Sequence, residues 1–367
     1  MDSLTQASLG AAVGVALMGR RTAAWKAALW GAAMGTLPDL DVVFDFGDPI
    51  RNMTEHRAES HALFYQLLAA PLLALMVARP RLRSLLANPS SPKPAGTSET
   101  SGAHSADNTS PYGRWTLATA LILVTHALLD GMTVYGTQLW LPFYKEAVGL
   151  ASVFIIDPFY TLPLLLGLAA ALVAKGNWGF KTLQLSLFVS SLYLVWSVAA
   201  QHWVEKTVQA NLPESQAALL VTPAPFNTLL WRLVAVSDSH YYEGWYSLLA
   251  DEPEAIEWRA VPRDPQLYLA LKDHPSVEGL ARFSDGFFQL ERIENSVVMT
   301  DLRMGQEPAY VFRFEIGRLD ASGALIGPVE RAPVARPPLE DGLAWLWQRL
   351  WGETALDLID WRAAKGT

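Results

Sequence analysis

Six long apolar stretches occupy the first 200 residues, and they constrain the fold of this chain more than any other feature. They lie at roughly 4–19, 23–37, 62–78, 115–130, 151–174 and 182–200. A helix needs about 20 apolar residues to cross the hydrocarbon core of a bilayer. The fifth and sixth stretches reach that length. We therefore expect residues 1–204 to form an all-α membrane bundle of about six transmembrane helices.

The first two stretches are shorter than a free span, and each contains a Gly-x-x-x-Gly pattern. The patterns are Gly10/Gly14 and Gly31/Gly35. Such spacing lets two helix backbones approach closely inside a membrane. It predicts a tightly packed helix pair, and a re-entrant or hairpin arrangement stays open for this pair.

Charge is distributed unevenly along the chain. Only 17% of its 367 residues are charged, against about 25% in a typical soluble domain. Residues 1–200 carry 13 Lys/Arg and 12 Asp/Glu, a net of +1, whereas residues 201–367 carry 15 and 24, a net of −9. The second half should therefore be water-soluble. No basic stripe suggests a nucleic-acid partner, and the absence of cysteine excludes disulfides and thiolate metal sites.

Basic residues are concentrated in alternate loops, which predicts an orientation. The segments at 20–26, 79–114 and 175–181 hold ten Lys/Arg, whereas 38–61 and 131–150 hold three. Basic loops stay on the cytoplasmic side of an inner membrane. We therefore expect both termini on the outside. The Ser-, Pro- and Gly-rich segment 84–113 is typical of a disordered cytoplasmic linker.

Residues 205–367 show short alternating runs separated by turn signals. The runs are Leu229–Val236, Gly286–Arg292, Ser296–Arg303 and Ala309–Gly317. This texture predicts a small extracytoplasmic α+β domain with an antiparallel sheet. A helix at about 339–351, carrying three tryptophans, is expected to close it by core or membrane-interface packing.

Polar residues, most of them ionisable, recur where the apolar stretches begin or end, and the predicted topology places them all at the outer face. They are Asp39 and Asp41 after the second stretch, His56, Arg57, Ser60 and His61 before the third, His126 and Asp130 at i and i+4 in the fourth, and Asp157 at the fifth. Ionisable groups are costly in a membrane and mark functional sites by default. Four separate stretches thus converge on one layer.

Three histidines and four aspartates at one depth predict a site for a divalent metal. Imidazole with carboxylate suits Zn²⁺, our first expectation, and also Mn²⁺ or Fe, whereas an all-oxygen set would suit Mg²⁺. We expect six ligands: Asp39, Asp41, His56, His61, His126 and Asp130. In this hypothesis Arg57 holds an anionic substrate, and Asp157 is a ligand or the general base.

Each motif also has a purely structural interpretation. The two aspartates at 39 and 41 are also suited to capping helices or solvating a loop, and His126 to packing in the core with one hydrogen bond. Arg57 and Ser60 are also typical of an interface anchor and a helix N-cap. True ligands of one ion should bring their donor atoms within roughly 3–4 Å of each other, since metal bonds are about 2.0–2.2 Å long.

Taken in order, these motifs resemble the YdjM-like family of inner-membrane, metal-dependent hydrolases. The resemblance covers roughly residues 1–200 and rests on Met1-Asp2-x-Leu4-Thr5, Pro38-Asp39-Leu40-Asp41, His56-Arg57-x-x-Ser60-His61, Thr125-His126 with Asp130, Tyr135-Gly136-Thr137, Pro142-Phe143 and Asp157-Pro158. Beyond residue 200, Thr222-Pro223-x-Pro225 and Trp231-Arg232 are similar to longer relatives. One position departs from the family pattern: Gln6 stands where a histidine is usual, so it is either outside the ligand set or a lost ligand.

The resemblance implies hydrolysis that depends on a divalent metal. We expect a membrane-bound hydrolase that acts on a phosphoester or lipid-linked substrate at the outer face of the bacterial inner membrane, with lipid as its neighbour. The alternative is a non-catalytic scaffold or regulatory protein that keeps the polar layer for structure and binds a partner through residues 201–367.

Overall fold

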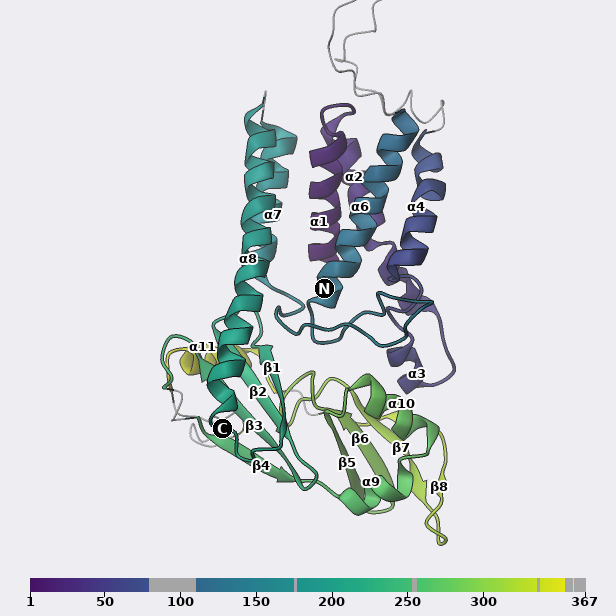
Figure 1. The fold of residues 1–367 in the computed structure, drawn as a ribbon, viewed down its shortest axis with the longest axis vertical. Coiled ribbons are helices and arrows are strands. Elements are labelled where there is room, and N and C mark those ends of the chain that lie inside the picture. Colours follow the sequence, from purple (N-terminus) through teal and green to yellow (C-terminus); the bar gives the residue numbers. More distant parts are fainter. Residues whose placement is uncertain (79–109, 175–176, 253–255, 335–336, 354–358, 360–367) are drawn as a thin grey trace, which may run out of the picture.

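Helices make up the first half of the chain, and two antiparallel sheets dominate the second (Figure 1). The computed structural model describes residues 1–78, 110–174, 177–252, 256–334, 337–353 and 359. The first half contains α1 (Ser3–Met18), α2 (Ala24–Thr36), the 3₁₀ helix η1 (Pro38–Val43), α3 (Pro49–Thr54), α4 (Leu63–Ala78), α6 (Pro111–Gly131), α7 (Pro158–Val173) and α8 (Trp178–Gln209).

Each of the six apolar stretches contains one of these helices, but two lengths differ from expectation. The fifth stretch was expected to be long enough to span, yet α7 has only 16 residues. The reason is local, because Asp157 accepts the Phe159 N–H as an N-cap and Pro158 starts the helix. The sixth helix is longer than its apolar stretch, and α8 continues without a break through residue 204 to Gln209.

Length and composition together identify one helix that can cross a membrane unaided. Among the described residues this is α8, with 32 residues; α1, α4 and α7 are shorter apolar helices. Residues 84–109 of the predicted linker at 84–113 lie outside the described residues. Its last three residues belong to α6 instead, and Ser110 caps that helix by accepting from the Gly113 N–H.

The α1–α2 pair packs backbone to backbone along its glycines, as the Gly-x-x-x-Gly spacing predicts. A Cβ added to Gly10 would lie 2.2 Å from the Gly31 carbonyl oxygen, and one added to Gly35 would lie 2.6 Å from the Gln6 carbonyl oxygen. No side chain fits at such distances. This close approach fixes Gln6 and the C-terminal end of α2 beside each other.

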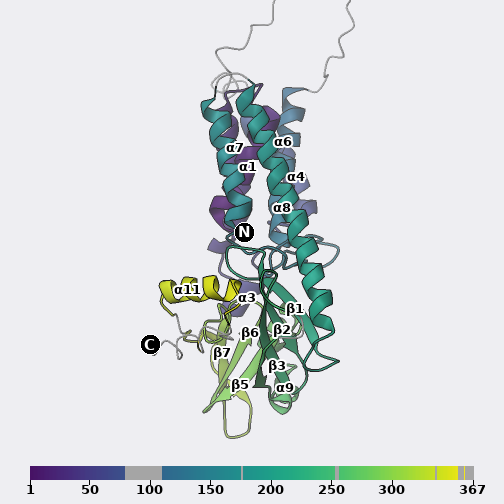
Figure 2. The same ribbon diagram turned by 90° about the vertical axis from the view of Figure 1, so that its left-hand side faces the viewer.

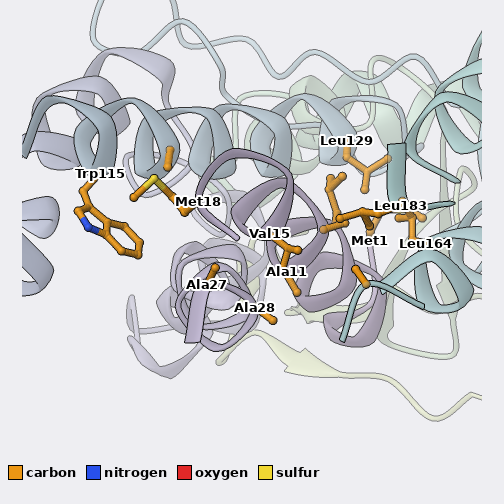
Figure 3. Close-up of a cluster of buried hydrophobic side chains, with 14 of the residues drawn as sticks. Met1, Ala11, Val15, Met18, Ala27, Ala28, Trp115, Leu129, Leu164 and Leu183 are labelled. Atoms are coloured by element: carbon orange, nitrogen blue, oxygen red, sulfur yellow. The ribbon is translucent and has the colours of Figure 1, made fainter. Parts of the chain in front are cut away.

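An apolar core joins α1 to its neighbours. Figure 3 shows its buried side chains, which come from α1, α2, α6, α7 and α8; among them Ala11 and Val15 of α1 lie between the other helices. Small residues dominate on α1 and α2, and larger ones such as Trp115, Leu164 and Leu183 fill the outer parts of the core. The packing holds the helix ends that carry the polar motifs in fixed positions.

The second half forms two sheets rather than the single sheet that the sequence predicted. The first has the order β1-β2-β3-β4 and the second the order β5-β6-β7-β8, with β9 also paired to β7; all pairs are antiparallel. The strands are β1 (Ala218–Pro223), β2 (Leu230–Val236), β3 (His240–Ser247), β4 (Trp258–Pro262), β5 (Phe288–Ile293), β6 (Ser296–Asp301), β7 (Arg313–Leu319), β8 (Leu325–Ile326) and β9 (Glu330–Arg331). Three helices accompany them: α9 (Pro265–Leu271), α10 (Pro275–Phe283) and α11 (Leu339–Leu350).

The two halves are joined by continuous packing. Ala200, Val204 and Val208 near the end of α8 belong to one buried cluster with residues of β1, β2 and β3. Ile50 and Met53 of α3, with Tyr135, belong to another with the second sheet. Figures 1 and 2 show the sheets at the same end of the helical half as the start of α1.

Candidate metal centre

Three segments bring their polar side chains to the end of the helical half that faces the sheets. Pro38 stops α2 and starts η1, which carries Asp39 and Asp41. The loop before α4 carries the motif at 56–61, and the last turns of α6 carry His126 and Asp130. Their convergence places side chains far apart in sequence within one buried pocket of polar groups.

Four of the six expected ligands form one compact group. They are Asp39, His61, His126 and Asp130, and one ligand atom from each lies within 4.8 Å of all the others. The two histidine Nε2 atoms are 3.0 Å apart. Asp130 Oδ2 lies 3.2 Å from His61 Nε2 and 3.4 Å from His126 Nε2. Asp39 Oδ1 lies 3.4 Å and 3.6 Å from the same two nitrogens.

These distances match the donor set of a tetrahedral ion. Four donors at bonds of about 2.0–2.1 Å would stand about 3.3–3.4 Å apart, and the five separations that involve a histidine nitrogen run from 3.0 to 3.6 Å. The set offers two imidazole nitrogens and two carboxylate oxygens, which suits Zn²⁺ or Mn²⁺ better than Mg²⁺. The residues therefore fit a divalent ion in both spacing and chemistry.

Each histidine is held by its other nitrogen. His126 Nδ1 lies 2.6 Å from the Gly35 carbonyl oxygen, to which it donates. His61 Nδ1 lies 2.8 Å from Ser60 Oγ, and Ser60 donates to Asp41 Oδ2 at 2.6 Å. Protons on both Nδ1 atoms leave both Nε2 lone pairs directed into the group, which is how carboxylates and carbonyls orient metal-binding histidines.

Asp130 uses its two carboxylate oxygens differently. Oδ1 accepts a hydrogen bond from Gln6 Nε2 at 3.0 Å, lies 3.4 Å from Arg57 and pairs with the amino group of Met1. Oδ2 faces the two histidines and has no hydrogen-bond partner among the described residues. Gln6 thus sits beside the four donors and orients one of them.

The electrostatics of the group favour a positive charge at its centre. Burial alone would lower the pKa of His61, but the three surrounding carboxylates raise it to about 9. Burial would raise the pKa of the Asp41 carboxyl, but hydrogen bonds from the two neighbouring histidines and Ser60 hold it well below its usual value. The same field that would retain a proton on His61 would favour a bound cation.

The other two expected ligands, Asp41 and His56, stand beside the group rather than in it. His56 Nδ1 lies 2.7 Å from Asp41 Oδ1, and its side chain is 21% exposed. Asp41 Oδ2 also accepts the Arg57 N–H at 3.0 Å. Both residues are therefore placed to orient the inner ligands, and His56 is partly exposed to solvent.

Arg57 points into the same region, as expected. Its backbone φ of 63° directs the N–H to Asp41, a conformation uncommon for a residue with a large side chain. The guanidinium lies 3.3 Å from Thr133 Oγ1 and 5.0 Å from the centre of the Tyr135 ring. It supplies a buried cation next to the four donors.

Asp157 makes hydrogen bonds that account for its buried carboxylate without a metal. One oxygen caps α7, and the other accepts from the Tyr193 hydroxyl at 2.7 Å. Its contacts in the described part of the chain are with α7 and α8, and it is outside the four-donor group. The sequence predicted a ligand or general base here; the structure places Asp157 at the same end of the bundle as the four donors, as the N-cap of α7.

The C-terminal domain packs against Tyr135, which forms part of the wall of the site. The centre of the Tyr135 ring lies 5.7 Å from that of His56. It lies 5.3 Å from the ring of Phe283, at the end of α10, and 5.9 Å from that of Phe312, just before β7. Burial raises the pKa of the Tyr135 hydroxyl, and that hydroxyl donates to the Met53 carbonyl oxygen.

Comparison with known proteins places the same residues in a recognised family. A family model described as YdjM inner membrane protein matches residues 1–204. The uncharacterized protein YfhP of Bacillus subtilis (strain 168) is 27% identical over 130 residues, which is 35% of this chain and 38% of that protein. The match thus spans well under half of that relative. No solved structure matches the chain.

Proposed function

This chain belongs to the YdjM inner membrane protein family, and from that premise we propose that it is a metal-dependent hydrolase whose ion is held by Asp39, His61, His126 and Asp130. The observation that carries the proposal is the convergence of four donor atoms on one buried centre. The two Nε2 atoms lie 3.0 Å apart, and each lies 3.2–3.6 Å from one oxygen of Asp130 and one of Asp39. Buried carboxylates favour a positive charge between them, and a divalent ion would supply it in place of a proton on His61.

Hydrolysis follows from what such an ion supplies and from what the surrounding residues can hold. A bound divalent ion lowers the pKa of its water towards neutrality and polarises a phosphoryl oxygen. Arg57, with its cation beside the group, would bind an anionic oxygen of the substrate. His56, held by Asp41 and partly exposed, would accept the proton from water. In this proposal His56 takes the role that the sequence suggested for Asp157.

A membrane lipid or lipid-linked phosphoester is the substrate class we propose. The 3₁₀ helix that carries Asp39 and the residue that caps its end also expose apolar side chains: Leu40, Val42, Val43 and Phe44 are 56–74% exposed. Exposed apolar side chains next to buried ligands give a hydrophobic approach to the site. A substrate with an acyl or prenyl chain would meet that approach from the bilayer.

We also propose that α1, α2, α4, α6, α7 and α8 all cross the membrane, with both termini outside. The supporting observation is the segregation of charge. The α1–α2 turn and the starts of α6 and α8 lie at the end opposite the sheets (Figure 1), and the segments there hold the basic loops. The metal group and the acidic domain share the other end. The short helices would cross as a packed bundle, whose partners compensate for length.

Hydrolysis is tested with full-length protein in lipid nanodiscs, supplied with Zn²⁺ or Mn²⁺ and offered chromogenic phosphomonoesters, phosphodiesters and short-chain phospholipids. Metal-dependent turnover is expected, and it should disappear in His126→Ala. His202→Ala is the matched control, since that histidine is exposed on α8. If the ion binds but no phosphoester or lipid ester is cleaved, the protein is a metal-binding scaffold and the hydrolase proposal fails.

Orientation is tested with single cysteines in a chain that has none of its own. A membrane-impermeant maleimide added to intact spheroplasts should label Ala321→Cys in the second sheet. It should label Ala95→Cys only after lysis. The reverse pattern would contradict the proposed orientation and place the metal group at the cytoplasmic face.

A further inference from the structure

Helix α11 packs against the first sheet through one face and exposes its opposite face. Trp345 is buried with Leu230 and Trp245, and the two indole rings meet edge to face at 4.8 Å. Arg349 anchors the end of the helix through Asp251 at 2.6 Å. The helix is therefore part of the folded domain, and its exposed side is a fixed surface.

That exposed side is a stripe of large apolar residues at a spacing of four. Leu339, Leu343, Trp347 and Trp351 are 74%, 44%, 64% and 58% exposed. The last two rings pack against each other at 5.8 Å. Residues four apart lie on one side of a helix, so the stripe is continuous. Leaving so much leucine and tryptophan in water is unfavourable, and such a patch marks an interaction surface.

The length of α8 gives a distance scale along the bundle, and a hydrogen bond to α8 places the segment that contacts α11 on that scale. At about 1.5 Å per residue, its 32 residues extend about 48 Å, against about 30 Å for the hydrocarbon core. Starting from Trp178, the helix would leave that core near Trp196. Trp196 Nε1 donates to Thr228 Oγ1 at 3.1 Å, so the turn between β1 and β2 lies at this level.

The contacts of α11 are with the same turn. Ala224 and Leu230, which flank Thr228, belong to the cluster that buries Trp345. Figure 2 shows α11 lying across the direction of the bundle, close to the end of the helices that faces the sheets. A helix at this level and in this direction would run along the bilayer surface, at the depth where tryptophan is enriched.

We infer that the Leu339–Trp351 stripe of α11 inserts into the outer interface of the membrane, so that α11 is a second, in-plane anchor of the C-terminal domain. Amphipathic helices of this kind bury their apolar face roughly 5–10 Å deep at the headgroup boundary. The described helix carries two acidic residues and one arginine, Glu340, Asp341 and Arg349. Anchoring would therefore be apolar rather than electrostatic. The inference rests on the proposed crossing of α8 and not on hydrolysis.

The consequence concerns the metal group. Fixing the domain at two points, α8 and α11, would hold the second sheet and Tyr135 in place over the ligands. The anchor would thus keep the wall of the site level with lipid headgroups, where a membrane substrate is found.

The test measures depth with nitroxide labels on the full chain in phosphatidylcholine vesicles. Labels are placed at Leu343→Cys and Trp347→Cys, whose side chains are exposed, so the fold is not disturbed. Ala321→Cys is the aqueous control and Leu192→Cys on α8 the lipid control. Collisions with oxygen, which partitions into lipid, are compared with collisions with a nickel chelate, which stays in water.

The α11 labels should resemble the label at Leu192 rather than the one at Ala321, with high oxygen and low nickel accessibility. Raising the salt from 0.05 M to 0.5 M, which shortens the Debye length on the order of threefold, should leave both accessibilities unchanged. Water-like accessibility at both positions would overturn the inference. So would low accessibility to both reagents, which would show a second copy covering the stripe. A water-like Leu192 label would instead overturn the crossing of α8, and the inference with it.

Discussion

Two buried ionic clusters in this molecule look alike in composition but differ in how their atoms are satisfied. In the C-terminal domain, Arg232 Nε donates to Glu243 Oε1 at 2.8 Å, and its Nη1 donates to the Leu302 carbonyl oxygen at 2.8 Å. The Tyr310 hydroxyl lies 3.2 Å from the same carboxylate. Every strong charge there meets its complement.

The group at the end of the helices contains no such complement at its centre. The two Nε2 atoms and one oxygen each of Asp39 and Asp130 face inward, and Asp130 Oδ2 has no hydrogen-bond partner in the described chain. A complete buried ion pair ties elements together, as Arg232 does between the two sheets. An incomplete one requires something from outside the chain. The difference between these clusters is the basis for assigning structure to one and metal binding to the other.

The largest effect should come from breaking the complete pair. Arg232→Met leaves Glu243 buried and uncompensated, which typically costs about 3–5 kcal/mol. The C-terminal domain should unfold at lower temperature, measured by its near-ultraviolet circular dichroism in detergent. Adding Glu243→Leu should restore most of that loss. A single variant as stable as the wild type would contradict the structural role of the pair.

Next in size is the removal of one ligand from the incomplete group. Four ligands share about 10–16 kcal/mol in structural zinc sites, so one ligand is worth about 3 kcal/mol, or more than a hundredfold in affinity. His126→Ala should lose that affinity in competition with a chelating dye, and the protein should still insert in membranes. His202→Ala, at an exposed histidine of α8, is the matched control and should keep the ion. Unchanged affinity in His126→Ala would show that the histidine is only packed.

A smaller effect is expected from the residue that orients His61. Asp41 accepts from Ser60, which in turn holds His61 Nδ1. Partners of this type are worth roughly 10–100-fold in metal affinity, so Asp41→Asn should fall in that range in the same dye competition. A loss as large as that of His126→Ala would show that Asp41 binds the ion directly.

The smallest effect is expected at Asp157, which belongs to neither cluster. Asp157→Asn keeps an N-cap and a partner for Tyr193, so stability should change by less than about 1 kcal/mol. Metal affinity should not change. A marked loss of metal in this variant would return Asp157 to the ligand set and enlarge the site beyond the four donors.

Much of this arrangement was predictable from the sequence, because apolar length and helix ends are local properties. The six apolar stretches predicted the helices, and the Gly-x-x-x-Gly patterns that begin at Gly10 and Gly31 predicted the close packing of α1 on α2. Four of the expected ligands met because alternate helix ends share one face of a bundle. That prediction required only the topology and the i, i+4 spacing of His126 and Asp130.

What could not be predicted depended on contacts between distant segments or on competing local roles. Asp39 and Asp41 are equivalent in sequence, and only the fold directs Asp39 to the two Nε2 atoms and Asp41 to Ser60 and His56. Asp157 precedes a proline, a pattern that suits an N-cap as well as a ligand. The strands β1, β3 and β4 were missed because none of them alternates cleanly between buried and exposed residues, and β8 and β9 because they have two residues each. Two sheets were therefore read as one.

The central claim, that the incomplete group binds one divalent ion, is tested most directly by the metal content of the purified full-length protein. Protein in detergent is equilibrated with Zn²⁺, Mn²⁺, Fe²⁺ and Mg²⁺ in separate samples, freed of unbound metal, and analysed by inductively coupled plasma mass spectrometry. We expect about one equivalent of Zn²⁺ or Mn²⁺ per chain, since the four donors form a single tetrahedral set, and little in His61→Ala. Wild-type protein that retains none of the four ions would contradict the account.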